Sequence, residues 1–176
     1  AIDVAYVATD TAAINAACDA SYPGEIAIPI WTTTPWTLPA SMAVSLHPEL
    51  EYVMMEGKGR ALIVAADLAD DCARRFGLDE VKILGRCSGA ALENQQLQHP
   101  FLDRQVPVIL GEHVTTEAGT GAVHTAPAHG QDDFIVGQQY GLDVYNPVGA
   151  NGVYLPETEL FGGQHVFKAN QAICEL

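Results

Sequence analysis

Two short segments of the sequence hold the residues that could do chemistry. The first, WTTTPWTLPAS at 31–41, places three successive threonines after an expected strand that ends at Trp31. Pro35 lacks an N–H and stops the strand ladder, so hydroxyls and free backbone N–H groups meet at a strand end. Such donors can bind a carboxylate, an ester carbonyl or a ribose hydroxyl. The alternative, a threonine-rich edge strand with two core tryptophans, is the commoner case in an arbitrary protein.

The second segment is GTGAVHTAPAHGQDDF at 119–134. Its first two glycines permit close backbone approach, but His124 replaces the third glycine of a dinucleotide fingerprint. The segment is also expected to run from a turn into a strand, which excludes that motif. Asp133, in the first turn of an expected helix, caps the helix or faces a cationic ligand group. For Asp132 capping is the simpler interpretation, and for His129 a structural hydrogen bond.

Metal chemistry and covalent catalysis are both poorly supported. The spacing of five between His124 and His129 matches neither the HExxH helix nor common zinc-finger spacing, so we expect no metal and no cofactor. There is no GxSxG elbow, and no Cys or Ser stands beside a convincing His–Asp pair. What remains is a cluster of threonine hydroxyls, one histidine and one aspartate. Such a cluster can orient a water molecule and a charged substrate without a covalent intermediate.

The charge balance limits the partners of the chain. Eight Lys and Arg residues stand against 22 Asp and Glu residues, for a net charge of −14, and Arg74–Arg75 is the only adjacent basic pair. A protein that grips nucleic acid through its phosphates needs a basic face. This chain therefore cannot hold a long duplex or a tRNA by itself, and any RNA it handles must be a short end delivered by something else.

Its four scattered cysteines form no CxxC unit and are expected to be reduced and individually buried or idle.

Hydrophobic periodicity predicts many short strands and a few helices. Strands are expected at 2–8, 25–31, 41–46, 51–55, 61–65, 81–84, 106–110 and 121–124, and helices from Asp10 or Thr11 to 19, at 67–76, at 132–140 and from about Lys168. This pattern favours a single β-rich domain, 1–176, which is either a barrel or an α+β fold. No apolar stretch is long enough to span a membrane, and no signal peptide is present, so the cytoplasm is the expected location.

The two segments together resemble the editing domain of class I aminoacyl-tRNA synthetases for branched aliphatic amino acids. WTTTPWTLPA followed some eighty residues later by GTGAVHTAP–HG–DD is similar to the isoleucyl type, and the resemblance extends to HPF at 99–101 and NPVG at 146–149. It implies a β-barrel decorated with short helices, inserted into a larger synthetase, with a pocket between the two motifs.

The resemblance also assigns roles to residues. Trp31, Thr32, Thr33, Thr34 and Thr37 would line the pocket around the terminal adenosine and the ester of the substrate. His124 would limit the volume of the amino-acid side chain, and Asp133 would bind the α-ammonium; Thr34, His124 and Asp133 are the expected catalytic group. Ser41 counts among the substrate-binding positions, although the isoleucyl pattern has Asn there. Ala128 and Gln131 replace the usual Gly and Pro in the connecting loop.

The implied activity is removal of valine from isoleucine tRNA. One methylene gives a binding pocket only about 1–3 kcal/mol of discrimination, a limit for which isoleucyl-tRNA synthetase is itself the standard example, so a second site must hydrolyse the error. The partners would be the aminoacylated 3′ end of tRNA, its valine moiety and the rest of the parent synthetase. Three alternatives stay open: a module that binds the tRNA end without turnover, a free-standing trans-editing hydrolase, and a zinc hydrolase. No HIGH- or KMSKS-like activation motif is present, and the abrupt ends of the chain favour a fragment of a synthetase over a free-standing enzyme.

Overall fold

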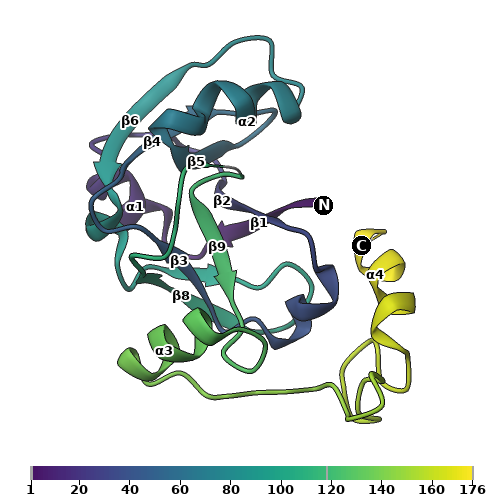
Figure 1. Ribbon diagram of the computed structural model, residues 1–176. Coiled ribbons are helices and arrows are strands. Elements are labelled where there is room, and N and C mark those ends of the chain that lie inside the picture. Colours follow the sequence, from purple (N-terminus) through teal and green to yellow (C-terminus); the bar gives the residue numbers. More distant parts are fainter. Residues whose placement is uncertain (1, 118, 176) are drawn as a thin grey trace.

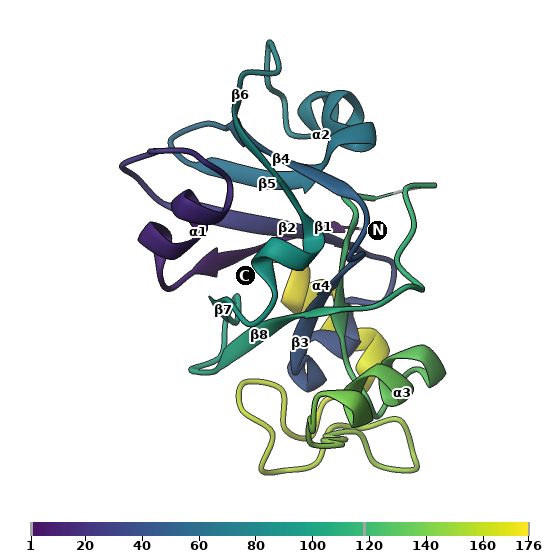
Figure 2. The ribbon, with the colours of Figure 1, turned by 90° about the vertical axis from the view of Figure 1, so that its left-hand side faces the viewer.

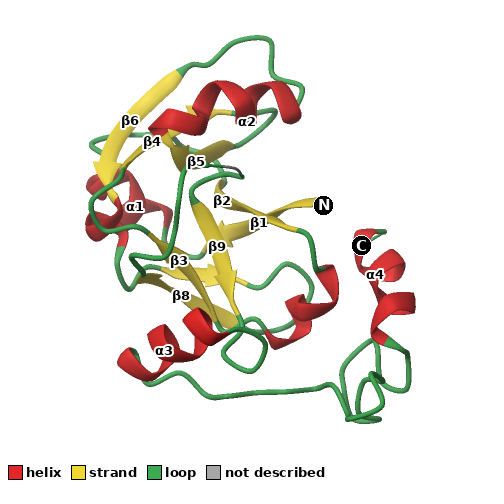
Figure 3. Cartoon of the chain, viewed as in Figure 1, coloured by secondary structure: helices red, strands yellow, loops and turns green. Residues whose placement is uncertain are grey.

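Nine strands form one mixed sheet in the computed structural model, which describes residues 2–117 and 119–175 (Figure 3). The strands are β1 (Ile2–Ala8), β2 (Ile26–Thr32), β3 (Ala43–Leu46), β4 (Glu51–Glu56), β5 (Ala61–Ala65), β6 (Ile83–Ser88), β7 (Gln96–Gln98), β8 (Gln105–Leu110) and β9 (Ala122–Thr125). The α-helices are α1 (Thr11–Ala17), α2 (Ala69–Arg75), α3 (Gln131–Gln139) and α4 (Val166–Cys174), and the 3-10 helices are η1 (Pro35–Ala40), η2 (Ala66–Leu68) and η3 (Gly89–Leu92). The predicted α+β class is confirmed.

The predicted barrel is wrong, because the sheet is open. Its strand order is β6-β4-β5-β2-β1-β7-β8-β3-β9, so β6 and β9 are its two ends. The parallel ladder between β2 and β5 covers only Ile26 and Ala27 on the β2 side. Two residues further on stands Pro29, which has no N–H to donate. Its carbonyl instead accepts a hydrogen bond from the Thr120 hydroxyl at 2.6 Å, just before β9, so the curled sheet approaches closure without a continuous ladder.

The core explains why these segments form strands. Every residue of β5 is buried, as are the four central residues of β4, and β2 is buried at six of its seven positions. Continuous apolar runs of this kind are typical of strands covered on both faces. On one side α2 covers the sheet, and α1 begins at Asp10, whose carboxylate accepts a hydrogen bond from Ala13 N at 3.1 Å. The predicted cap of this helix is therefore confirmed.

Three elements were missed and several boundaries differ. The expected strand at 41–46 begins at 43, the expected helix at 67–76 is divided into η2 and α2, and the expected strand at 81–84 is β6, which runs from 83 to 88. Neither 3-10 helix η1 nor η3 was predicted, and β7, only three residues long, was missed. Short elements of this kind carry too few residues to show a period.

The C-terminal part of the chain packs back onto the first motif. Figures 1 and 2 show α2 with β4 to β6 at one end of the molecule, and α3 with the loop after it at the other. That loop leads to α4, which contacts η1. In the described ranges no helix is long and apolar enough to cross a membrane.

Two of the cysteines are not isolated, contrary to expectation. Cys18 Sγ lies 3.1 Å from Cys87 Sγ, joining the end of α1 to β6. The hydrogen bond from the Cys87 thiol lowers the pKa of Cys18, whereas the pKa of Cys87 is raised. Cys72 is buried and Cys174 exposed, as single free thiols.

Candidate active site

The first motif changes from strand to turn within three residues. β2 extends to Thr32, one residue beyond the predicted end, and η1 begins at Pro35, whose fixed φ suits the first position of a helix. Thr32 is buried, and its Oγ1 accepts a hydrogen bond from Thr34 N at 3.1 Å. The Thr34 hydroxyl lies 3.5 Å from the Thr32 hydroxyl. Thr33 and Thr34 are exposed, so their hydroxyl groups stand at the surface of the turn.

A hydrogen-bonded chain joins the first motif to the second. Thr37 Oγ1 donates to the Thr34 carbonyl at 2.8 Å and lies 3.1 Å from His124 Nε2. A carbonyl oxygen can only accept, and a threonine hydroxyl has one proton to give. His124 Nε2 therefore carries the proton and donates to Thr37. The predicted proximity of Thr34, Thr37 and His124 is thus found in the structure.

This chain of bonds also determines the state of His124. Burial lowers the pKa of His124 to about 4, so the ring is neutral near pH 7. With the proton on Nε2, Nδ1 is an unprotonated acceptor. Nδ1 is buried and has no hydrogen-bond partner within the described part of the chain. A pKa so far below 7 makes the ring a weak base and leaves it neutral, with Nδ1 able to accept a hydrogen bond.

Asp133 lies at the start of α3 and does not cap it. Its Oδ2 accepts a hydrogen bond from Ala126 N at 3.0 Å, which closes the loop before the helix. The N-cap of α3 is Gly130, with no side-chain cap bond, so the capping role considered for Asp132 is not found and Asp132 is exposed. Asp133 is half-buried, and burial raises its pKa above the usual range. A nearby cation would stabilise the charged form of this carboxylate and lower its pKa again.

His129 of the second motif contacts the first motif. Its ring packs edge-to-face on Trp36, with centroids 5.1 Å apart. The expected structural hydrogen bond of its side chain is wrong: Nε2 is buried without a partner among the residues described, and only the backbone N–H bonds, to Ala126 O at 2.9 Å. Burial lowers the pKa of His129, and Asp133 opposes that shift. The charge of Asp133 therefore acts on the pKa of His129, and a positive charge on His129 would lower the pKa of His124.

Two predicted site residues lie elsewhere. Trp31 points to the opposite face of β2 from Thr32, as alternation requires, and packs against Gly119. It lines a cavity with residues of α2, such as Arg74. Ser41 is fully buried, and its Oγ lies 2.8 Å from Tyr6 OH, so its side chain secures the end of η1 to β1.

Sequence reasoning missed the residues that hold η1 in place. His99 Nε2 donates to Leu38 O at 2.7 Å, and Asn170 Oδ1 accepts from Trp36 N at 2.8 Å. The hydroxyl of Tyr154 donates to Trp36 O, so both backbone groups of Trp36 are held by the C-terminal segment. Only HPF at 99–101 was noted in the sequence, because contacts across 61 to 134 residues leave no local pattern.

The donor set does not resemble a metal centre. Within 2–117 and 119–175, no group of three or more His, Cys, Asp or Glu side chains is gathered so that it could hold a metal ion. The prediction that the site works without a metal or cofactor stays a prediction.

Comparison with known proteins defines the class of the domain. The crystal structure described as GlLeuRS-CP1 superposes with a TM-score of 0.78 at 16% identity, covering 98% of this chain and 93% of that one. The cytosolic leucyl-tRNA synthetase editing domain of P. knowlesi gives a TM-score of 0.73 at 9% identity, covering 98% and 91%. At these identities the likeness shows the fold, which is that of a synthetase editing domain.

The chain belongs to the family described as leucyl-tRNA synthetase, editing domain, whose model matches residues 19–160. Within it, the similarity is to isoleucine–tRNA ligases. That of Alkalilimnicola ehrlichii is 60% identical over 158 residues, 90% of this chain and 17% of the relative. That of a Shewanella species is 56% identical over the whole chain, which spans 19% of the relative. The predicted resemblance to the isoleucyl type of editing domain is therefore confirmed.

Proposed function

We propose that this site hydrolyses the ester between valine and isoleucine tRNA, as the proofreading domain of a cytoplasmic isoleucine–tRNA ligase. The observation that carries the proposal is the 3.1 Å contact between Thr37 Oγ1 and His124 Nε2, which joins the two motifs. The half-buried Asp133 carboxylate is bonded to Ala126 N, two residues after His124. The aminoacylation activity and most of the tRNA affinity would belong to the rest of the ligase, since this chain has a net charge of −14.

Asp133 would bind the α-ammonium of the misattached amino acid. One hydrogen bond from Ala126 leaves most of the acceptor capacity of the carboxylate free. Partial burial makes an ammonium partner valuable, because the carboxylate has lost part of its hydration. The exposed hydroxyls of Thr33 and Thr34 would contact the ester and the ribose.

The hydrolysis would proceed by attack of a bound water on the ester carbonyl. The bond between the acyl carbon and the ribose oxygen breaks, a proton from the water passes to that oxygen, and valine and tRNA are released. His124 is too weak a base near pH 7 to take this proton efficiently. Its place is the wall of the side-chain pocket, where a neutral, hydrogen-bonded ring excludes the extra methylene of isoleucine.

The test is deacylation of valyl-tRNA by the ligase carrying Asp133→Ala, with Asp132→Ala as the matched control. Loss of a charge-assisted contact worth about 1.5–3 kcal/mol predicts a rate roughly 10- to 150-fold lower. The control removes an adjacent, exposed carboxylate of the same helix turn and should stay within twofold. Unchanged hydrolysis with Asp133→Ala would remove this residue from the mechanism. Binding of valyl-tRNA without any turnover in the wild type would favour a binding module instead.

A further inference from the structure

The few cations of this chain are concentrated in one region. Six of the eight Lys and Arg residues fall between positions 58 and 86: Lys58, Arg60, Arg74, Arg75, Lys82 and Arg86. This stretch runs from the turn after β4 to β6 and includes α2. In a chain of net charge −14, it is the part to which an anion would be drawn.

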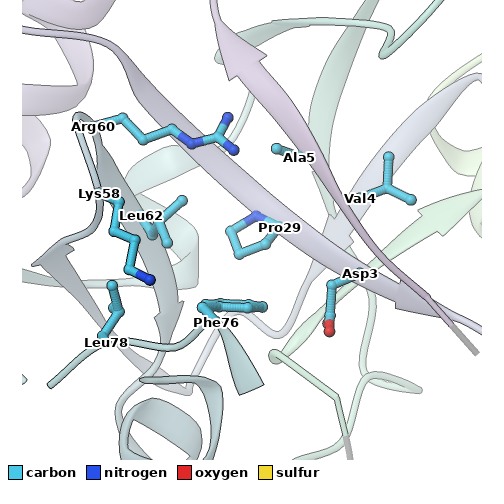
Figure 4. A pocket seen from close by; sticks show the side chains of 9 residues that line it. All are labelled: Asp3, Val4, Ala5, Pro29, Lys58, Arg60, Leu62, Phe76 and Leu78. Carbon is cyan, nitrogen blue, oxygen red and sulfur yellow. The ribbon is translucent and has the colours of Figure 1, made fainter. Parts of the chain in front are cut away.

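Two of these cations enter a cavity. Lys58 and Arg60 lie on the turn between β4 and β5, which closes with a hydrogen bond from Gly57 N to Arg60 O at 2.6 Å. The cavity beneath them measures about 310 Å³. In Figure 4 both side chains reach over it from the same turn, and Phe76, Pro29 and Leu62 provide its apolar surface. A cationic rim over an aromatic, apolar floor fits a ligand that is both anionic and flat.

The acids nearby do not cancel these charges. Asp3, which lines the cavity, is held by Arg75 through two contacts, Nη2–Oδ1 at 2.7 Å and Nε–Oδ2 at 3.1 Å. Arg60 has a single contact with Glu25 at 3.4 Å, between half-exposed side chains. Lys58 has no carboxylate within salt-bridge distance in the ranges 2–117 and 119–175, unlike Lys82 with Glu56 and Arg86 with Glu51. The cavity therefore keeps a net positive charge.

The cavity is lined in part by β2, the strand that leads to the candidate site. Pro29 lies on β2, two residues before Trp31 and on the same face. Asp3 on β1 is paired directly with Trp31. Pro29 and Thr32 are three positions apart, roughly 10 Å along a strand. Pro29 and Thr32 point to opposite faces of β2, but the cavity extends to Asp3, which is paired with Trp31 next to the end of the strand. A polymer whose end reaches the threonines could therefore pass around the end of β2 and place an earlier unit in the cavity.

We propose that this cavity binds one nucleotide of the unpaired RNA strand that precedes the terminal adenosine, with a phosphate at Lys58 and Arg60 and the base on Phe76. The proposal rests on the proposed function. A volume near 310 Å³ lies at the lower end of small-ligand sites, about 300–1,000 Å³, and suits a single nucleotide. Phosphate contact combined with aromatic stacking is the usual means of holding single strands.

The experiment compares two double variants of the ligase that each remove two cations. Lys58→Ala with Arg60→Ala empties the cavity rim, and Lys82→Ala with Arg86→Ala is the matched control on or beside β6. Kinetics of deacylation are measured for valyl-tRNA and for valyl-adenosine, which has no preceding nucleotide. The rim variant should raise KM for valyl-tRNA roughly tenfold at unchanged kcat. Its KM should also depend less on salt, by about 0.7 in logarithmic slope for each lost contact. The control should change KM by less than twofold, and valyl-adenosine hydrolysis should be unaffected in both variants.

The outcomes separate this proposal from the proposed function. If the wild type hydrolyses valyl-tRNA and the rim variant matches the control, the RNA subsite is wrong and the proposed function stands. If the wild type hydrolyses neither substrate, the proposed function fails and the subsite with it. If added AMP binds the wild type and not the rim variant while KM for valyl-tRNA is the same in both, the cavity is a site for a free nucleotide, which also overturns the proposal. Recovery of KM with Lys58→Arg and Arg60→Lys would support a phosphate contact.

Discussion

The candidate site and the basic cavity carry opposite charges. Around η1 the histidines are kept neutral, since burial lowers the pKa of both His99 and His124 to about 4. The half-buried carboxylate of Asp133 is bonded to the backbone of Ala126, two residues after His124. At the turn between β4 and β5, Lys58 and Arg60 present cations over apolar surface. The cavity lies where β1 and β2 face the turn between β4 and β5, and the candidate site begins just beyond the end of β2.

This difference corresponds to the two ends of the proposed substrate. An aminoacyl-tRNA carries a cationic ammonium on its amino acid and anionic phosphates on its RNA. A cationic histidine cluster beside Asp133 would compete for the carboxylate, so neutral rings keep it available for the ammonium. Few cations, placed away from the site, suffice when the rest of a ligase supplies most of the RNA affinity.

The largest expected effect concerns the size limit of the neutral site. His124→Ala removes the ring and opens space for one more methylene. Hydrolysis of isoleucyl-tRNA should then rise by about 100-fold, within the range of 10–200-fold that one methylene accounts for. Deacylation of valyl-tRNA and isoleucyl-tRNA by the same ligase variant measures this directly. If the isoleucyl ester stays intact, His124 is not the wall.

The neutrality of the histidines predicts a loss of stability in acid. His99 and His124 bind a proton near pH 4 when folded but near pH 6.5 when unfolded. As the pH falls from about 6.5 to about 4, the unfolded chain takes up protons first, so stability declines; above pH 6.5 the contribution is complete. We expect a fall of roughly 2–3 kcal/mol per pH unit in the middle of that interval, since each ring contributes about 1.4 kcal/mol per unit. Urea unfolding of the chain at several pH values would show it, and His99→Gln should flatten the curve while His165→Gln, at an exposed position, should not.

A smaller effect is expected from the hydroxyl that links the two motifs. Thr37→Val removes the acceptor of His124 Nε2 and the donor to Thr34 O. Leaving these two groups unpaired costs about 1–3 kcal/mol, so the discrimination between valyl-tRNA and isoleucyl-tRNA should weaken roughly tenfold. Thr37→Ser keeps the hydroxyl and should retain discrimination. Equal behaviour of the two variants would mean that the hydrogen bond does not orient the ring.

The smallest effect is expected at the C-terminal clamp. Asn170→Ala removes the acceptor of Trp36 N and should lower the free energy of unfolding by about 1 kcal/mol. Lys168→Ala, an exposed change on the same helix, should be close to neutral. Thermal unfolding of both variants measures the difference, and equal values would exclude a stabilising clamp.

The sequence allowed the motifs to be found but not their relative placement. Apolar runs and the Asp10 cap are local signals, and they predicted β1, β2, β5 and α1 closely. The barrel prediction failed because the end strands β6 and β9 pair with β4 and β3 alone, so no ladder closes the sheet. Asp133 and His124 were identified from their motif and the family resemblance; the structure brings His124 to η1 through Thr37, and Asp133 to the backbone of Ala126.

The parts that could not be predicted depend on contacts between distant residues. Ser41 reads as a ligand-facing hydroxyl beside its motif, yet it is fully buried against Tyr6, 35 residues away. The tautomer of His124 likewise depends on a distant residue. The Thr37 hydroxyl gives its one proton to Thr34 O, so His124 Nε2 must carry a proton and donate it to Thr37. Periodicity and spacing describe neighbours in the chain and hold no information on such contacts.

The most direct test of the central claim is a structure of the domain with a non-hydrolysable valyl-adenosine analogue. The account predicts that the α-ammonium lies within hydrogen-bond distance of the Asp133 carboxylate, with the valine side chain against His124 and the ester beside Thr33 and Thr34. An analogue bound with its amino group away from Asp133, or seated in the cavity under Lys58 instead, would contradict it.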